Sequence, residues 1–157
     1  MILFLMINES SLIERELVIR DLRISSEVSE TRKASIRWLA LALGIINPGE
    51  SRQMAIAVLD SLIEYQFIKK IDPTAKDLIQ YISEKWGPIN EKTLRYHLLR
   101  FKKMGLIDNK DAKFFFTPPE VGDRFDIDNW VNAFLTSYYK PIANKISAII
   151  KNIQSKS

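Results

Sequence analysis

The sequence predicts a mainly α-helical protein that carries one small β-hairpin, with further helices before and after it. Apolar residues recur at spacings of three and four along most of the 157-residue chain, which is the period of amphipathic helices. Asn-Pro-Gly at 47–49, Gly-Pro at 87–88 and Pro-Pro at 118–119 interrupt these patterns, as helix and turn boundaries do. Between 106 and 117, two short apolar runs flank a polar turn, which is typical of a hairpin.

Composition narrows the classes of function. Hydrophobic residues make up 46% of the chain, enough for a buried core in a protein of about one domain's length. The absence of cysteine excludes disulfides, thiolate zinc sites and cysteine nucleophiles, and it fits a reducing, cytoplasmic setting. The chain has one histidine, no glycine-rich phosphate loop and no Ser-His-Asp set. We therefore expect no enzymatic activity, no cofactor and no bound metal.

The first 49 residues are expected to form a helical extension used for packing or dimerisation. Residues 1–7 are apolar, but a bilayer-spanning helix needs roughly 20 residues, so we expect a packing strand or an irregular start and no membrane association. Met6 is an alternative initiator. Helical spacing predicts one helix from Ser10 to Arg23 and a second from Ser29 to Ile46, which the Asn-Pro-Gly motif ends.

A second segment, residues 50–119, is predicted to alternate helices with short extended pieces. The pattern predicts a helix over 50–66, an extended piece over 67–71, and a helix that Asp72 caps and that runs through Trp86. Asn90 is expected to cap a basic helix over 90–104. The hairpin over 106–117 is expected to turn at Asp108-Asn109-Lys110-Asp111.

The basic helix and the hairpin concentrate the positive charge of the chain. Residues 91–113 hold seven Lys or Arg against three acids, a balance that equals the net charge of +4 of the whole protein. Such clustering is an electrostatic footprint for nucleic acid, although charge alone also fits a solvated helix face. At 100° per residue, Leu94, Leu98 and Phe101 share one face within about 40°, and the cations occupy the opposite side.

The stretch from Thr93 to Ile107, TLRYHLLRFKKMGLI, resembles the recognition helix and first wing strand of winged helix-turn-helix regulators. The ArsR-, MarR- and PadR-like groups are the nearest. The resemblance covers about residues 50–119 and implies a winged-helix fold with helix 90–104 in the major groove of DNA and wing 106–117 on the backbone. The ArsR-type cysteine ligands are missing, and the wing is short and carries two aspartates.

The residues expected to contact DNA fall into two groups. Base edges or nearby phosphates are assigned to the outward face and its flanks; these residues are Lys92, Thr93, Arg95, Tyr96, His97 and Arg100. Phosphate contacts are assigned to Lys102, Lys103, Lys110 and Lys113. His97 lies at the edge of the buried face, where packing is the alternative role. Leu99 points outward, towards a thymine methyl group or towards the wing.

The last segment, residues 120–157, is predicted to be an amphipathic helix that Pro141 kinks or divides in two. Its acidic start, Glu120 to Asp128, fits the positive end of a helix better than a calcium loop. The aromatic stripe that contains Trp130, Phe134, Tyr138 and Tyr139 suits a dimer interface, with core packing or a pocket for an unidentified small-molecule effector as alternatives.

These observations lead to a hypothesis for function. We expect sequence-specific binding of double-stranded DNA by a homodimeric transcriptional regulator that dimerises through its terminal helices. The competing hypothesis is a winged-helix module that docks onto a protein of the transcription or replication machinery, because the same fold serves both purposes.

Overall fold

The computed structural model describes residues 7–157 and is mainly helical, as the sequence predicts. The described residues form six α-helices and one two-stranded antiparallel sheet, together with a 3-10 turn and a π-helical turn. The chain divides into two compact units, one up to Ile56 and one from Ala57 to Ser157. The second unit contains most of the predicted 50–119 segment and the whole predicted 120–157 segment. The apolar start over 1–6 lies outside the described residues.

In the first unit, the predicted helix over 10–23 is wrong. Only the 3-10 turn η1 (Glu9–Leu12) forms there, and the chain then runs without a helix to Ser25. Arg20 explains the difference. Its backbone N–H donates to Ala42 O (2.9 Å), and its guanidinium donates to Leu41 O (2.8 Å) and Ile46 O (3.0 Å). These bonds hold the extended segment against the C-terminal end of the helix over Arg32–Ala42 and the turn that follows it.

The predicted helix over 29–46 is divided and shorter. Helix α2 (Ser26–Glu30) and helix α3 (Arg32–Ala42) are separated by Thr31, whose extended backbone (φ −131°) lets its hydroxyl cap α3 at Ala34 N (3.1 Å). After α3 the chain turns at Gly44, with φ of +70°. A side chain at Gly44 would collide with the backbone of Val18, so this turn requires glycine.

The second unit begins within helix α4 (Gln53–Ile63), which continues into the π-helical turn η2 (Glu64–Lys69). The predicted extended piece over 67–71 is therefore wrong for its first three residues. The wider turn ends at Lys70 in the left-handed conformation (φ 58°), and it contains Gln66 with its side chain buried. Asp60, also buried, accepts hydrogen bonds from Tyr81 Oη (3.1 Å) and Trp86 Nε1 (2.9 Å).

Helices α5 (Ala75–Lys85) and α6 (Glu91–Lys103) follow, and both have side-chain caps. Asn90 caps α6 as predicted, accepting from Thr93 N at 2.8 Å. The cap of α5 is Thr74 and not Asp72, because Thr74 and Asp77 form a reciprocal capping box. The buried faces of α5 and α6 supply a large part of the core of this unit: Leu78, Tyr81, Ile82, Leu94, Leu98 and Phe101.

A hairpin of strands β1 (Ile107–Lys110) and β2 (Lys113–Phe116) completes the middle of the unit. Its turn is Asp111-Ala112 rather than the predicted 108–111. Both central residues have positive φ (53° and 62°), which is the mark of a type I′ turn. The hairpin also pairs with the segment before α5, through a bridge from Thr74 to Lys113 and a hydrogen bond from Phe114 N to Pro73 O (2.9 Å).

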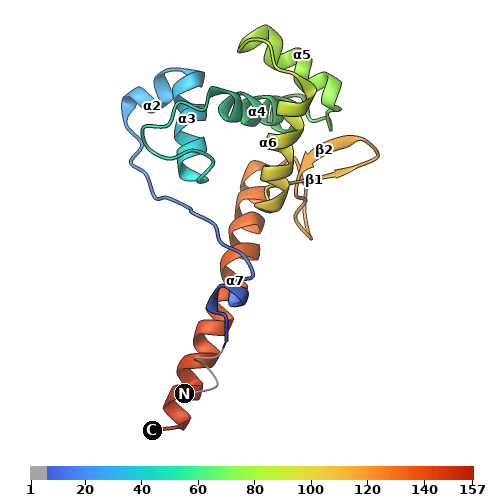
Figure 1. The fold of residues 1–157 in the computed structure, drawn as a ribbon. Helices are drawn as coiled ribbons and strands as arrows, with labels where there is room; N and C mark the ends of the chain where they lie inside the picture. Colours follow the sequence, from blue (N-terminus) through green and yellow to red (C-terminus); the bar gives the residue numbers. More distant parts are fainter. Residues whose placement is uncertain (1–6) are drawn as a thin grey trace. The chain divides into compact units, whose positions relative to one another are not determined.

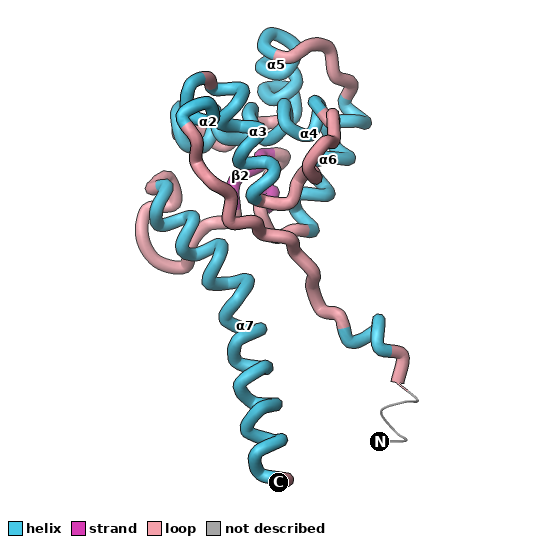
Figure 2. The backbone as a smooth tube through the Cα atoms, turned by 90° about the vertical axis from the view of Figure 1, so that its left-hand side faces the viewer, coloured by secondary structure: helices cyan, strands magenta, loops and turns pink. Residues whose placement is uncertain are grey.

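Helix α7 (Ile127–Ser155) is a single helix of 29 residues with Pro141 inside it. Of the two expected effects of Pro141, a kink or a division into two helices, the division does not occur. Figure 1 shows α6 and the hairpin beside the first half of α7, while the second half extends away from them. Figure 2 shows the same extension from the side. Trp130 and Phe134 are buried, and Trp130 packs against Phe116 of β2 with ring centroids 4.9 Å apart.

Candidate nucleic-acid interface

Helix α6 divides into a buried face and a charged exposed face. Leu94, Leu98 and Phe101 are each at most 3% exposed, as their spacing predicts. Most of the predicted contact residues lie on the other side, in solvent: Lys92, Arg95, Tyr96, Lys102 and Lys103 are exposed. Thr93 and Arg100 are half-buried at the border between the two faces. The buried face fixes the helix in its unit, and the opposite face is available to a partner.

His97 is the predicted contact residue whose position differs most from the expectation. Its side chain is only 7% exposed and belongs to the buried face of α6. Its ring lies edge-on to the ring of Tyr96, with centroids 5.0 Å apart. The alternative role that the sequence left open, packing, therefore fits His97 better than contact with a polyanion, and Tyr96 carries the exposed ring.

Two of the cations on this face are paired within the protein. Arg95 forms an ion pair with Glu91 one turn earlier (Nη2 to Oε1, 2.9 Å), and both side chains are more than half exposed. Lys102 Nζ donates to Asn109 Oδ1 (2.8 Å) and lies 3.6 Å from Asp108 Oδ1, so it links α6 to strand β1. Exposed pairs of this kind contribute about 0–1 kcal/mol, and a phosphate can therefore displace the carboxylate at little cost.

The tip of the hairpin adds two more cations. Lys110 and Lys113 face each other in the ladder, directly before and after the type I′ turn, and both are exposed. Like charges opposite one another in an antiparallel pair repel. An anion placed between or above them would reduce this repulsion, part of which the exposed Asp111 in the turn already offsets.

A hollow of about 280 Å³ lies between α6 and the hairpin. It is bordered by apolar and polar residues of both elements: Arg95, Leu98, Leu99, Lys102, Ile107, Asp108, Asn109 and Phe114. This places Leu99, which is 53% exposed, on the wing side of the helix. Of the two roles that the sequence suggested for Leu99, the neighbourhood of the hairpin agrees with its position.

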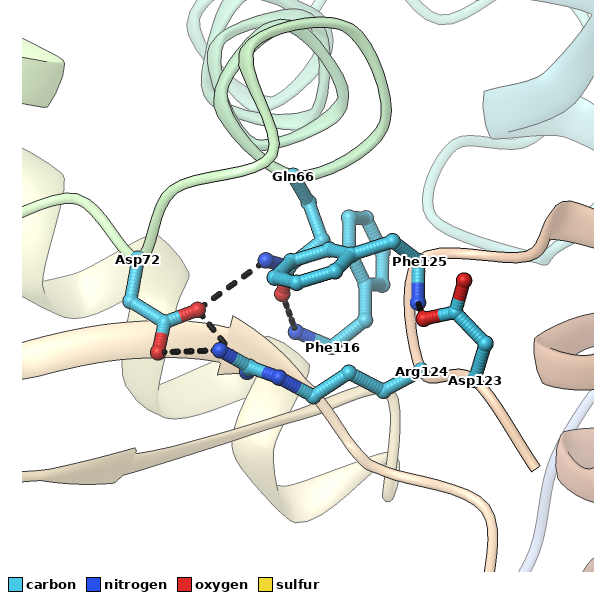
Figure 3. A network of polar contacts seen from close by, with 6 residues as sticks. All are labelled: Gln66, Asp72, Phe116, Asp123, Arg124 and Phe125. Carbon is cyan, nitrogen blue, oxygen red and sulfur yellow. Dashed lines mark hydrogen bonds and ion pairs between the residues drawn. The ribbon is translucent and has the colours of Figure 1, made fainter. Parts of the chain in front are cut away.

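A polar network holds the hairpin against its unit (Figure 3). The N–H of Phe116 in β2 donates to Gln66 Oε1 (2.7 Å), and Gln66 Nε2 donates to Asp72 Oδ1 (3.0 Å). Arg124, just before α7, reaches both Asp72 oxygens with its two terminal nitrogens, at 2.9 and 2.8 Å. The network thus ties β2, η2 and the approach to α7 together around a single carboxylate.

The charge of Asp72 is stabilised within this network. Partial burial by itself would raise the pKa of Asp72. The hydrogen bonds from Arg124 and Gln66, together with the positive charges of Arg124 and Lys113, outweigh burial and hold the pKa below its usual value. Because Lys113 is also a predicted phosphate contact, the network and the hairpin tip are electrostatically linked. Sequence patterns give no signal for this network, since Gln66 and Phe116 are 50 residues apart.

A second hollow lies between the loop after β2 and the middle of α7. Its volume is about 610 Å³, and its lining includes Pro118, Pro119, Phe134 and Lys140. Of the predicted aromatic stripe, Trp130 and Phe134 are core residues that stack on each other (centroids 5.2 Å apart), while Tyr139 is 57% exposed. The stripe therefore packs in the core at Trp130 and Phe134 and is exposed to solvent at Tyr139.

The described residues offer no grouping of three or more His, Cys, Asp or Glu side chains that could hold a metal ion. None of the helices in residues 7–157 combines the length and apolar character that crossing a membrane requires. The exposed face of α6 carries cations and the ring of Tyr96, and the hairpin tip carries Lys110 and Lys113. Comparison of the chain with protein-family models, with curated proteins and with solved structures found no match.

Proposed function

We propose that the protein is a winged helix-turn-helix transcriptional regulator that binds double-stranded DNA with sequence specificity, as a homodimer. The observation that carries this proposal is the exposed face of α6, where Lys92, Arg95 and Tyr96 stand clear of the core beside a hairpin with Lys110 and Lys113 at its tip. In this proposal α6 is the recognition helix and the hairpin is the wing.

The order and pairing of the elements support the winged-helix part of the proposal. Three helices, α4, α5 and α6, precede the hairpin in the chain, and a Gly-Pro turn joins α5 to α6. The segment before α5 pairs with β2 through the Thr74–Lys113 bridge. A winged helix is expected to pair the segment between its first two helices with the wing. Here the pairing consists of the bridge at Thr74 and the hydrogen bond to Pro73 O, outside the predicted extended piece over 67–71.

The mechanism follows from the chemistry of the exposed side chains. An α-helix fits the major groove, where Arg95 can pair with the edge of a guanine and Tyr96 or Thr93 can reach bases or phosphates. Lys103, Lys110 and Lys113 are suited to phosphates, which position the protein without reading the sequence. Arg95 and Lys102 would exchange their carboxylate partners, Glu91 and Asp108, for phosphate or base acceptors.

A binding titration with two matched variants tests this proposal. The variant Lys92→Ala/Arg95→Ala/Tyr96→Ala removes two cations and the ring from the exposed face of α6. Lys151→Ala/Lys156→Ala removes two exposed cations from the C-terminal end of α7, away from the hairpin. We expect the first variant to lose most of its affinity for duplex DNA in fluorescence anisotropy and the second to bind like the parent. Equal, tight binding by a folded triple variant would contradict the proposal.

A protein-docking module is the second candidate, and one observation favours it. The hollow beside Leu99 is lined partly by apolar side chains, and Leu99 itself is about half exposed, which suits a partner's side chain better than a phosphate. Titration of random duplex at two salt concentrations separates the candidates. A DNA-binding protein binds at low salt and loses affinity steeply as salt rises, whereas a docking module binds little at either concentration.

A further inference from the structure

The second half of α7 carries an apolar stripe that no part of residues 7–157 covers. Every residue from Tyr139 to Ser157 is exposed, and the stripe contains Tyr139 (57% exposed), Ile146 (55%) and Ile153 (62%). Ile142, Ile149 and Ile150 extend it, at 40%, 58% and 61%. Single exposed apolar side chains are ordinary, but a continuous row of them marks an interaction site. A helix of this kind is also marginal in water unless its apolar face is buried.

The spacing of the stripe identifies another helix as its partner. Tyr139, Ile142, Ile146, Ile149 and Ile153 alternate steps of three and four, which is the a/d repeat of a coiled coil. At 100° per residue these five side chains lie within about 40° of one line, the narrow seam that one helix presents to another. Ile150 lies beside the seam and widens it.

We propose that this stripe pairs with the same stripe of a second copy of the chain, as an antiparallel two-stranded coiled coil. The proposal specifies the contact surface of the homodimer proposed above and rests on it. In the register we infer, Ile142 packs in a layer with the partner's Ile153, and Ile146 packs with the partner's Ile149. The two-fold axis passes between residues 147 and 148, and it repeats both contacts, which gives four layers of isoleucine.

Charge sets this register. After Asp128 the chain has no acidic residue. The lysines in the second half of α7 therefore meet no acidic residue in the same segment of the second copy. The register must instead keep the lysines of the two copies apart. Lys140 and Lys151 lie on the side of the helix opposite the seam. Lys145, at the edge of the seam, falls beside the partner's Asn152, and Ile150 falls beside the partner's Ala143. The alternative register shifted by seven residues would place Lys145 against the partner's Lys145.

The direction of the pair follows from the seam residues and from the helix ends. Isoleucine at both a and d positions disfavours a parallel two-stranded coil and shifts parallel assemblies towards three or four strands. An antiparallel pair also sets the positive end of each helix near the negative end of the other. A basic amphipathic helix can instead lie on an anionic membrane, but such helices use Trp, Phe or Leu on the apolar side, and residues 142–153 use only isoleucine and alanine.

Cysteine cross-linking tests the register directly, since the natural chain contains no cysteine. Ile142→Cys and Ile153→Cys are made as separate proteins, mixed under conditions that exchange subunits, and oxidised. We expect a covalent dimer from the mixture. Ile153→Cys alone should stay uncross-linked, because its two sulfurs would be separated by eleven residues of helix, about 16 Å, beyond the reach of a disulfide. Efficient cross-linking of Ile153→Cys with itself, or none in the mixture, would overturn the proposal.

Oligomeric state gives a second, independent test. Ile146→Asp/Ile149→Asp places charge in the central layers, and Asn144→Asp/Ser147→Asp places the same charge on the opposite side of α7. By light scattering after size exclusion, we expect the first variant to be monomeric at a concentration where the wild type and the second variant are dimers. A seam variant that stays dimeric places the dimer interface elsewhere and overturns the coil while leaving the homodimer intact.

Two further outcomes would also overturn the coil, and DNA binding distinguishes them from failure of the proposed function. A monomeric wild type that sediments with anionic phosphatidylserine vesicles assigns the stripe to a lipid surface, and a trimeric wild type assigns it to a parallel bundle. In either case, duplex binding that depends on Lys92, Arg95 and Tyr96 would leave the DNA-binding proposal standing. If the coil is correct, the monomeric seam variant should bind an isolated half-site like the wild type and lose its preference for paired half-sites.

Discussion

The network around Asp72 makes a prediction with a definite size. Arg124→Met keeps the apolar stem of the side chain and removes the guanidinium, with its two hydrogen bonds to Asp72 at 2.9 and 2.8 Å. Hydrogen bonds to charged groups contribute about 1.5–3 kcal/mol when buried, and exposed ion pairs contribute about 0–1 kcal/mol. The Arg124 and Asp72 side chains are 35% and 21% exposed, which lies between these cases.

We therefore expect Arg124→Met to lower the free energy of unfolding by about 1–2 kcal/mol at neutral pH. For a chain of this size, that loss corresponds to a decrease in Tm of about 2–8 °C. Urea unfolding at pH 7, followed by tryptophan fluorescence, measures it; Trp86 and Trp130 both report on the second unit. Arg95→Met is the matched control, because it breaks an exposed pair at the surface of α6 and should cost no more than about 0.5 kcal/mol.

The loss of unfolding free energy caused by Arg124→Met also depends on pH, because it comes from the ionised form of Asp72. The pKa of Asp72 is lower in the folded protein than in the unfolded chain, where a carboxyl of this type has a pKa of about 3.9. The stabilisation is therefore fully present above the unfolded pKa and is lost as pH falls from about 5 towards the lower folded pKa. Wild type and Arg124→Met should differ most at pH 7 and converge as pH falls below the folded pKa of Asp72. A difference that is absent at pH 7, or that grows as pH falls, would refute the reasoning.

Three further predictions concern other parts of the second unit. Lys110→Ala should reduce the slope of log affinity for duplex DNA against log salt by about one, measured by anisotropy between low and moderate salt; an unchanged slope would remove the hairpin tip from the interface. Ala112→Gly should stabilise the protein by about 0.5–1 kcal/mol, because Ala112 has a φ of 62° in a type I′ turn that prefers glycine; a decrease in Tm would contradict that turn. Asp60→Ala should destabilise by about 2–4 kcal/mol in urea unfolding, because it removes the carboxylate to which Tyr81 and Trp86 donate, and an effect below 1 kcal/mol would show that other groups replace it.

Local signals in the sequence predicted part of this fold well. The basic helix, its Asn90 cap and its buried face were predictable because capping and helical spacing are properties of neighbouring residues. The position of the hairpin in the chain was predictable, but the residues of its turn were not. Asp108 and Asn109 resemble turn residues, yet they belong to strand β1. The predicted roles of the exposed residues on α6 are consistent with their positions and stay predictions until binding is measured.

The errors arose where distant contacts override local pattern. Residues 10–23 have helical spacing, but Arg20 hydrogen-bonds to carbonyls more than twenty residues away and the segment does not form the helix. The Asp72-Pro73 pair resembles a helix cap, whereas Asp72 is used by Arg124, which is 52 residues further along the chain. His97 differs from these cases, because helical spacing already placed it at the edge of the buried face of α6, where the structure buries it.

Selection from a random duplex library tests the central claim, sequence-specific DNA binding by α6, most directly. The wild-type protein and the Lys92→Ala/Arg95→Ala/Tyr96→Ala variant are each taken through rounds of binding and sequencing. The proposal predicts that the wild type enriches inverted repeats whose half-sites have a fixed spacing, one helical turn of about 10–10.5 base pairs or a multiple of it, and that the variant enriches none. No enrichment by the wild type, or the same motif enriched by the folded variant, would contradict it.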